Sequence, residues 1–227
     1  MLTQSDVAQN LHPQSHFALS GVRRPAASDA IATVGVVMSF GRNAEVYAEG
    51  EASGYVYKVL SGVVRVSKLL PDGRRQISAF HLPGEMFGFE AGNLHHTSAE
   101  AVVPAKVIAY KWDGLMDQGK QSASVVRELL NMTVRGLRHT QDHLLLLGRK
   151  NALERLAAFL LEMDARTGSK HVLDLAMPRH DIADYLGLTL ETVSRMFAEL
   201  KEIGALKLES ARRVHLLDTG KLEALGG

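Results

Sequence analysis

Residues 178–199 limit the possible fold more narrowly than any other part of the sequence. A helix-turn-helix needs a small residue where its two helices cross and a residue that tolerates positive φ in the turn. Ala183 and Gly187 supply these two features. The positions that must be buried carry apolar side chains, namely Ile182, Leu186, Leu188, Val193 and Met196. The segment therefore predicts a helix-turn-helix, which places its second helix in the major groove of DNA. The alternative is an ordinary helical hairpin in a protein core.

The second helix of this motif carries four side chains that are candidates for reading bases. Glu191 and Arg195 are four residues apart and so share a helix face, with Leu190 and Ser194 beside them. An arginine can donate two hydrogen bonds to guanine, a glutamate can accept one from cytosine, and a leucine can pack on a thymine methyl group. We predict that these four residues contact bases. A solvated ion pair between Glu191 and Arg195 is the alternative.

Contacts to the DNA backbone are expected around the same motif. The hydroxyl of Thr189 can cap the second helix, whereas Pro178 offers no capping oxygen to the first. The predicted phosphate contacts are Thr189, Thr192, Arg179, Arg212 and Arg213. Residues 149–227 carry 12 Lys and Arg against 12 Asp and Glu, so the electrostatic signature usual in a nucleic-acid binder is missing. The prediction of DNA binding therefore depends on the motif.

The remainder of the chain divides into three further parts. Residues 1–30 are polar and predict a loosely ordered arm. Residues 31–115 contain short β-like runs, among them 55–60, 63–69, 76–80 and 106–110, separated by turn residues. This spacing favours a small antiparallel barrel or jelly roll. A dimerisation helix is expected over residues 116–148, and residues 149–227 should form a winged helix. The predicted fold class is therefore α+β.

The long helix indicates a homodimer. A helix of about 25 residues spans roughly 38 Å, more than one small barrel can cover. A second copy of the helix would complete the packing as a parallel seam. We predict interface positions at Leu129, Leu137, Leu144 and Leu147. Two consecutive core helices with a break near Gly136 are the alternative.

Composition removes several classes of function. The chain has no cysteine, which excludes disulfides and thiolate metal sites. Its start is not a secretory signal, and runs such as residues 144–147 are far too short to span a membrane. We expect a cytoplasmic protein with no membrane partner.

An enzyme is the main rival from another class. His81, His95, His96 and Glu100 could hold a metal as in a cupin. However, the His-x-His spacing is missing, and adjacent His95 and His96 would point to opposite faces of a strand. No Gly-x-Ser-x-Gly elbow is present. We therefore predict no catalytic residues and no metal site.

Several segments together resemble the Crp/Fnr superfamily of bacterial regulators. The resemblance is carried by DIADYLGLTLETVSR (181–195), RKNALERLAAFLLEM (149–163) and GRRQISAFHLPGEMFGFEAG (73–92), and it extends from about residue 31 to the C-terminus. It implies an N-terminal β-roll like a cyclic-nucleotide-binding domain, a dimerisation helix and a C-terminal winged helix. The chain is most similar to the Fnr and FixK branches.

Departures from the family pattern narrow the branch. Cyclic-AMP-responsive members carry an arginine where this chain has Thr97, and without that cation a cyclic phosphate loses its charge-assisted partner. The resemblance therefore argues against cyclic AMP. It also argues against the iron–sulfur cluster of Fnr, because no cysteine is present. The cyclic-AMP-responsive members also carry an arginine where this chain has Leu190 and a glycine where it has Ser194. Leu190, Glu191, Ser194 and Arg195 instead look like the branch that reads a TTGA-type half-site in a palindrome.

The resemblance implies roles that the residues alone do not. FixK-like proteins lack the cluster and serve low-oxygen or nitrogen-related gene control, commonly as activators. Contact with RNA polymerase is implied for residues 77–87, with Ile77, Phe80 and Gly84 as candidates. No cofactor is expected. A regulator responsive to haem or to another small ligand is the alternative.

Overall fold

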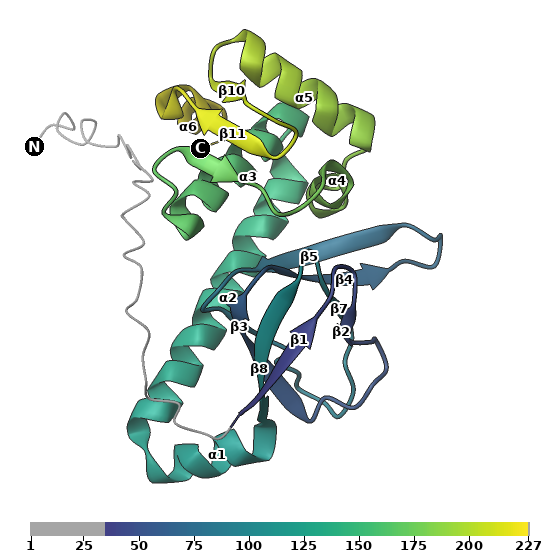
Figure 1. The fold of residues 1–227 in the computed structure, drawn as a ribbon, viewed down its shortest axis with the longest axis vertical. Coiled ribbons are helices and arrows are strands. Elements are labelled where there is room, and N and C mark those ends of the chain that lie inside the picture. The colour runs from purple at the N-terminus through teal and green to yellow at the C-terminus, as the bar shows by residue number, and fades with distance from the viewer. Residues whose placement is uncertain (1–34, 227) are drawn as a thin grey trace, which may run out of the picture.

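The computed structural model describes residues 35–226, so the predicted N-terminal arm at residues 1–30 lies outside the described residues. Figure 1 shows a β-roll, a long helix that runs along one side of it, and a smaller helical domain at the end of that helix. The three parts follow the chain in this order, as the sequence predicts. Among the described residues, no helix is long and apolar enough to cross a lipid bilayer.

The roll consists of two four-stranded antiparallel sheets. One has the order β1-β8-β3-β6 and the other the order β2-β7-β4-β5. The strands are β1 (Val36–Phe40), β2 (Glu45–Tyr47), β3 (Tyr55–Ser61), β4 (Val64–Leu69), β5 (Arg75–His81), β6 (Met86–Phe87), β7 (Ser98–Ala101) and β8 (Ala105–Lys111). Gly62 turns the chain between β3 and β4 with φ of 80°, and a Cβ there would lie 2.5 Å from the Pro104 carbonyl oxygen. Only glycine fits this close approach.

Side chains from both sheets fill the interior of the roll. Small and β-branched residues such as Val59, Ala99 and Val107 are fully buried there. Tyr47, Tyr57 and Phe87 pack among them, with ring centroids 5.3–6.2 Å apart. The roll is therefore a packed core and not an open barrel.

The helical connection differs from the predicted single helix over residues 116–148. Helix α1 (Trp112–Gln121) follows β8 directly, and α2 (Ala123–Arg149) begins after a break. The break lies at Ser122, whose backbone is extended, and the Ser122 and Ser124 hydroxyls bond to each other at 2.8 Å. Serine favours such local bonding over the helix interior. Helix α2 continues through Gly136, which excludes the break considered at that position.

The C-terminal domain is a winged helix. It contains α3 (Ala152–Thr167), α4 (Arg179–Leu186), α5 (Leu190–Glu202) and a three-stranded sheet of order β10-β11-β9. Its strands are β9 (Val172–Asp174), β10 (Leu206–Leu208) and β11 (Arg213–Leu216). Helix α6 (Thr219–Gly226), which the sequence analysis did not predict, packs against α3. A capping box at Asn151 and Glu154 starts α3.

One hydrophobic cluster joins the roll to the winged helix. Phe80 of β5 lies 5.2 Å from the ring of Tyr185 in α4 and 6.5 Å from that of Phe159 in α3. Ile77 and Leu82 belong to the same cluster. Shared burial of this kind fixes the orientation of the DNA-binding domain relative to the roll.

Candidate DNA-binding interface

Helices α4 and α5 have the geometry of a helix-turn-helix. Gly187 ends α4 in the left-handed conformation, with φ of 62°. Thr189 caps α5 by accepting a hydrogen bond from the Thr192 backbone N–H at 3.2 Å. Pro178 precedes α4 without a capping side chain, so the first turn of α4 keeps uncapped N–H groups. These features agree with the sequence analysis.

The four predicted base-reading residues share the exposed, N-terminal part of α5. Leu190, Glu191, Ser194 and Arg195 are all exposed. Neither Glu191 nor Arg195 forms an ion pair with any described residue, so the intrahelical pair considered as an alternative is not formed. The Ser194 hydroxyl donates to the Leu190 carbonyl oxygen at 2.9 Å and keeps its acceptor lone pairs free. The face therefore presents a free carboxylate, a free guanidinium, a hydroxyl and an apolar group, which together match base edges.

Arg179 lies differently from its predicted role as a phosphate contact. Its guanidinium is stacked on the Phe197 ring of α5, 3.1 Å from the ring centroid. Burial lowers the pKa of Arg179 to about 10. Since the side chain is held against α5 by this stacking, the half-buried Arg179 joins the two helices of the motif.

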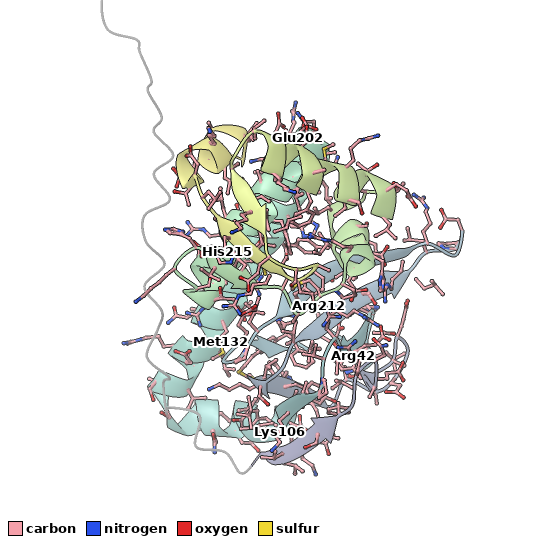
Figure 2. The ribbon with its side chains drawn as sticks, turned by 45° about the horizontal axis from the view of Figure 1, so that its top comes forward. Arg42, Lys106, Met132, Glu202, Arg212 and His215 are labelled. Atoms are coloured by element: carbon pink, nitrogen blue, oxygen red, sulfur yellow. The ribbon has the colours of Figure 1, made fainter. Side chains whose placement is uncertain are left out.

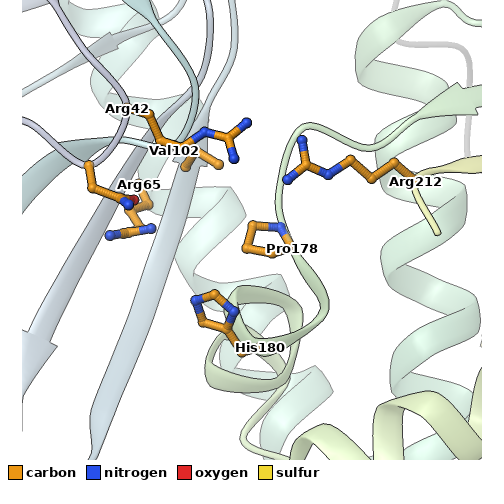
Figure 3. Close-up of a pocket in the computed structure, with 7 residues that line it drawn as sticks. Arg42, Arg65, Val102, Pro178, His180 and Arg212 are labelled. Atoms are coloured by element: carbon orange, nitrogen blue, oxygen red, sulfur yellow. The ribbon is translucent and has the colours of Figure 1, made fainter.

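The two predicted wing arginines have different surroundings. Arg213 is exposed and lies 3.4 Å from a carboxylate oxygen of Glu209. Arg212 is half-buried and faces the roll across a pocket (Figure 3). Of the predicted phosphate contacts, Thr189, Thr192 and Arg213 therefore lie near the surface of the motif, and Arg212 points into the junction between the two domains.

A cluster of buried charges holds α4 against the roll. The Asp181 carboxylate, which is fully buried, accepts hydrogen bonds from Arg65 at 2.8 Å and from Arg75 at 2.5 Å. Arg65 also bonds to Glu100 at 3.1 Å, and Arg75 to Asp184 at 2.7 Å. We call these five residues the inter-domain clamp. Residues from β4, β5 and β7 thus determine the position of the first helix of the DNA-reading motif.

The sequence analysis missed the clamp as an interaction. Asp181 and Asp184 are three residues apart on one helix, and such a pair is also common on solvated helix faces. Their partners lie more than 100 positions away along the chain. A signal existed in Asp181 itself, since a carboxylate between buried positions of a helix needs a cationic partner.

A second charged network joins the end of β5 to α2 and α3. Arg166 donates to Glu85 at 2.8 Å and to Glu162 at 2.6 Å, and it also contacts the Phe80 carbonyl oxygen. His139 of α2 lies 3.5 Å from Glu162. Burial lowers the pKa of His81 to about 4, although Glu85 opposes this change. Glu85 is therefore engaged with α3.

Helix α2 exposes an apolar stripe opposite its intramolecular contacts. At about 100° per residue, the exposed side chains gather on one face, whereas the buried Val125, His143 and Leu146 lie on the other. The stripe consists of Val126, Leu130, Val134, Leu137 and Leu144, each 49–70% exposed.

The structure alters the predicted interface set. Leu137 and Leu144 belong to the stripe. Leu129 and Leu147 lie about 100° away from it along the helix surface, and both are half-buried within the single chain. Leu147 packs against the core cluster that joins the domains. Leu130, Leu137 and Leu144 follow one another at intervals of seven residues, and this spacing was the signal that separates the exposed stripe from Leu129 and Leu147.

The predicted polymerase-contacting residues are mostly in the core. Ile77 and Phe80 are 0% and 1% exposed, so neither can touch a partner in this structure, and that prediction is wrong for both. A β-bulge in β5, where Ser78 is the extra residue opposite Val66 and Ser67, brings both side chains to the buried face although they are three positions apart. Gly84 lies in an exposed turn with φ of 94°.

Thr97, where the sequence analysis expected no cation for a cyclic phosphate, is engaged with other side chains of the roll. Thr97 forms a side-chain hydrogen bond with Tyr47, whose pKa is raised by burial. Tyr47 stacks on His95 with ring centroids 3.6 Å apart.

The metal set considered for a cupin is not assembled. His81 stacks on Phe87, and Glu100 bonds to Arg65. Within residues 35–226, no three His, Asp or Glu side chains are grouped so that they could hold a metal ion.

Comparisons with known proteins agree with this architecture. Residues 37–122 match the family described as "Cyclic nucleotide-binding domain", and residues 154–225 match the family described as "Crp-like helix-turn-helix domain". The nitrogen fixation regulation protein FixK of Azorhizobium caulinodans is 42% identical, over 94% of this chain and 91% of its own length. The transcriptional activator protein Anr of Pseudomonas aeruginosa is 34% identical, over 80% of this chain and 76% of its own. The structure of FixK2 from Bradyrhizobium japonicum has a TM-score of 0.82 and 47% identity, and the match covers 86% of this chain and 98% of that one.

Proposed function

Because the chain is a member of the Crp/Fnr family of transcription regulators and is close to the FixK proteins, we propose that it activates transcription by binding a palindromic DNA site as a homodimer. The observation that carries this proposal is the exposed, unpaired Glu191 and Arg195 on the N-terminal part of α5. A free guanidinium and a free carboxylate one helical turn apart can read one G·C pair or adjacent base pairs without first breaking a salt bridge.

The proposed half-site is of the TTGA type. Arg195 would bond to the guanine, Glu191 to a cytosine of the complementary strand, and Leu190 would pack on a thymine methyl group. Thr189, Thr192 and Arg213 would contact phosphates beside these bases. The side chains required for each contact are exposed or half-exposed at the surface of the motif.

The apolar stripe on α2 supports the dimer. Val126, Leu130, Val134, Leu137 and Leu144 would be covered by the same residues of a second copy, as in a parallel coiled coil. Two recognition helices related in this way would enter successive major grooves, about 34 Å apart on DNA. A palindromic target follows from that symmetry.

The names of the relatives suggest the genes under control. They include nitrogen fixation regulation proteins and transcriptional activators. We propose a role in nitrogen-related or low-oxygen gene control, exercised in the cytoplasm through contact with RNA polymerase. Of the candidate polymerase contacts, only the Gly84 turn is exposed.

Regulation by cyclic AMP does not fit the residues present. Thr97 bonds to Tyr47 and carries no charge, while Glu85 is paired with Arg166. A cyclic phosphate would lack the arginine that the cyclic-AMP-responsive members carry at the position of Thr97. We expect the protein to bind DNA without cyclic AMP.

Selection of binding sites from random DNA tests the function directly. The wild-type protein should enrich a TTGA-type palindrome, and Arg195→Ala should weaken binding by about 1–3 kcal/mol per half-site while relaxing the preference at the guanine. Lys201→Ala, exposed at the other end of α5, is the matched control. Equal affinity of wild type and Arg195→Ala for the selected site would contradict the assigned role.

A further inference from the structure

A pocket of about 230 Å³ lies where the roll meets the winged helix, and its charged lining is basic. Arg42 comes from the turn between β1 and β2, Arg212 from the wing, and His180 from the first turn of α4. Figure 2 shows Arg42 and Arg212 at the junction of the two domains. In Figure 3 their guanidinium groups point toward each other from opposite walls, with Pro178 and His180 beneath them.

Two of the cationic side chains that line this pocket, Arg42 and Arg212, are uncompensated. Arg65 and His180 also line it, but Arg65 is paired with Asp181 and Glu100, and the His180 ring lies 3.0 Å from the Asp181 carboxylate. Neither Arg42 nor Arg212 forms an ion pair or a side-chain hydrogen bond with any residue that the structure describes. No carboxylate is among the lining residues. Two free guanidinium groups that face each other repel one another and favour an anion between them.

The backbone holds both arginines in place. Asn43 beside Arg42 has φ of 59° and donates its N–H to the Ala101 carbonyl oxygen at 2.7 Å. The Arg212 N–H bonds to the Ser210 hydroxyl, and its carbonyl oxygen accepts from Leu175 at 2.9 Å. The uncapped first turn of α4 adds the positive end of a helix dipole beside Pro178. The side chains of Arg42 and Arg212 therefore extend from fixed backbone positions, one on the roll and one on the winged helix.

We propose that this pocket binds an oxyanion of the phosphate class and that the anion bridges the roll to the DNA-binding domain. At about 30 Å³ per liquid water molecule, its volume accommodates inorganic phosphate or a small phosphate ester. Planar guanidinium groups match phosphate oxygens with paired hydrogen bonds. The phosphate has two possible sources, a free small molecule or the backbone of bound DNA. In either case the ion would stabilise the domain arrangement seen here.

Calorimetric titration of the full chain with inorganic phosphate, at constant ionic strength and without DNA, tests the free-anion source. Arg42→Gln and Arg212→Gln should each weaken phosphate binding about tenfold or more, because each removes a charge-assisted contact. Lys207→Gln, which removes an exposed cation of the wing strand β10 outside the pocket, is the matched control and should bind phosphate as wild type does. This arm needs no DNA, so its result is independent of the proposed function.

The second arm measures DNA affinity against salt concentration. If a DNA phosphate occupies the pocket, Arg42→Gln should lower the slope of log K against log salt by about 0.9, the value for one lost phosphate contact. Free phosphate should then compete with DNA. If a free anion occupies it, the slope stays unchanged and phosphate strengthens DNA binding. The proposal is overturned if the Arg42 and Arg212 variants match wild type in both arms.

Discussion

Replacement of Asp181 by asparagine should destabilise the protein more than its position in a surface motif suggests. Arg65, Arg75 and His180 all lie within 3.0 Å of the Asp181 carboxylate, which is fully buried. An amide presents one acceptor oxygen where the carboxylate presents two, and its NH₂ group would face the guanidinium donors. The change therefore leaves buried positive charge without its partner.

The magnitude follows from the remaining partners. Breaking a buried ion pair by removing one member costs about 3–5 kcal/mol. Arg65 keeps Glu100 and Arg75 keeps Asp184, so we expect the lower end, about 3 kcal/mol. Asp184→Asn, three residues later on the same helix, should cost less because Asp184 is 30% exposed and pairs with one arginine.

Urea unfolding of the two variants measures this difference. With a slope of a few kcal/mol per molar urea, Asp181→Asn should lower the midpoint by about 1 M. The double variant Arg65→Met/Asp181→Leu should recover part of the loss, since both buried charges of that pair are removed together. An unchanged midpoint for Asp181→Asn would refute the role assigned to the clamp. So would a double variant whose loss of unfolding free energy exceeds the summed losses of Arg65→Met and Asp181→Leu measured singly.

Three further predictions address other parts of the molecule. Leu137→Ala should raise the dimer dissociation constant roughly 30- to 150-fold, since about 1–1.5 kcal/mol is lost on each of two copies. Sedimentation equilibrium measures this constant, with Arg135→Ala, which lies off the stripe, as the control. An unchanged constant would remove Leu137 from the interface. Since burial lowers the pKa of His81 from 6.5 to about 4, the folded protein favours the neutral ring, and His81 contributes full stability above pH 6.5 that is lost as the pH falls toward 4. The free energy of unfolding should therefore change less between pH 7 and pH 4.5 for His81→Gln than for wild type. His96→Gln, an exposed control, should match wild type. An equal change in all three proteins would count against His81. Leu190→Arg combined with Ser194→Gly should shift the selected DNA site toward that of the cyclic-AMP-responsive branch, and selection of an unchanged site would argue against the branch assignment.

Local patterns in the sequence were sufficient for the elements and for the exposed face of α5. The positive φ at Gly187, the cap at Thr189 and the exposure of Glu191 and Arg195 depend on residues close together in the chain. The strands at residues 55–61 and 64–69 also follow from their own β-branched residues and turns. Such features could be predicted because each is determined within about one turn or one hairpin.

Features that depend on distant contacts could not be predicted in the same way. Arg179 was expected on DNA because nothing local indicates that Phe197 would accept its guanidinium. Ile77 and Phe80 were expected on a surface because no short segment reveals that β5 packs on the winged helix, where both are buried. The break at Ser122 was missed because the flanking residues continue a helical pattern.

The inter-domain clamp also bears on how freely such regulators can exchange parts. The carboxylate of Asp181 belongs to the DNA-reading motif, whereas the arginines that neutralise it belong to the roll. A winged helix transplanted from this chain onto a roll without those arginines would bury an unpaired charge. The two domains are therefore not interchangeable modules. A hybrid regulator that takes the winged helix of this chain will also need the arginines of β4 and β5 in its roll.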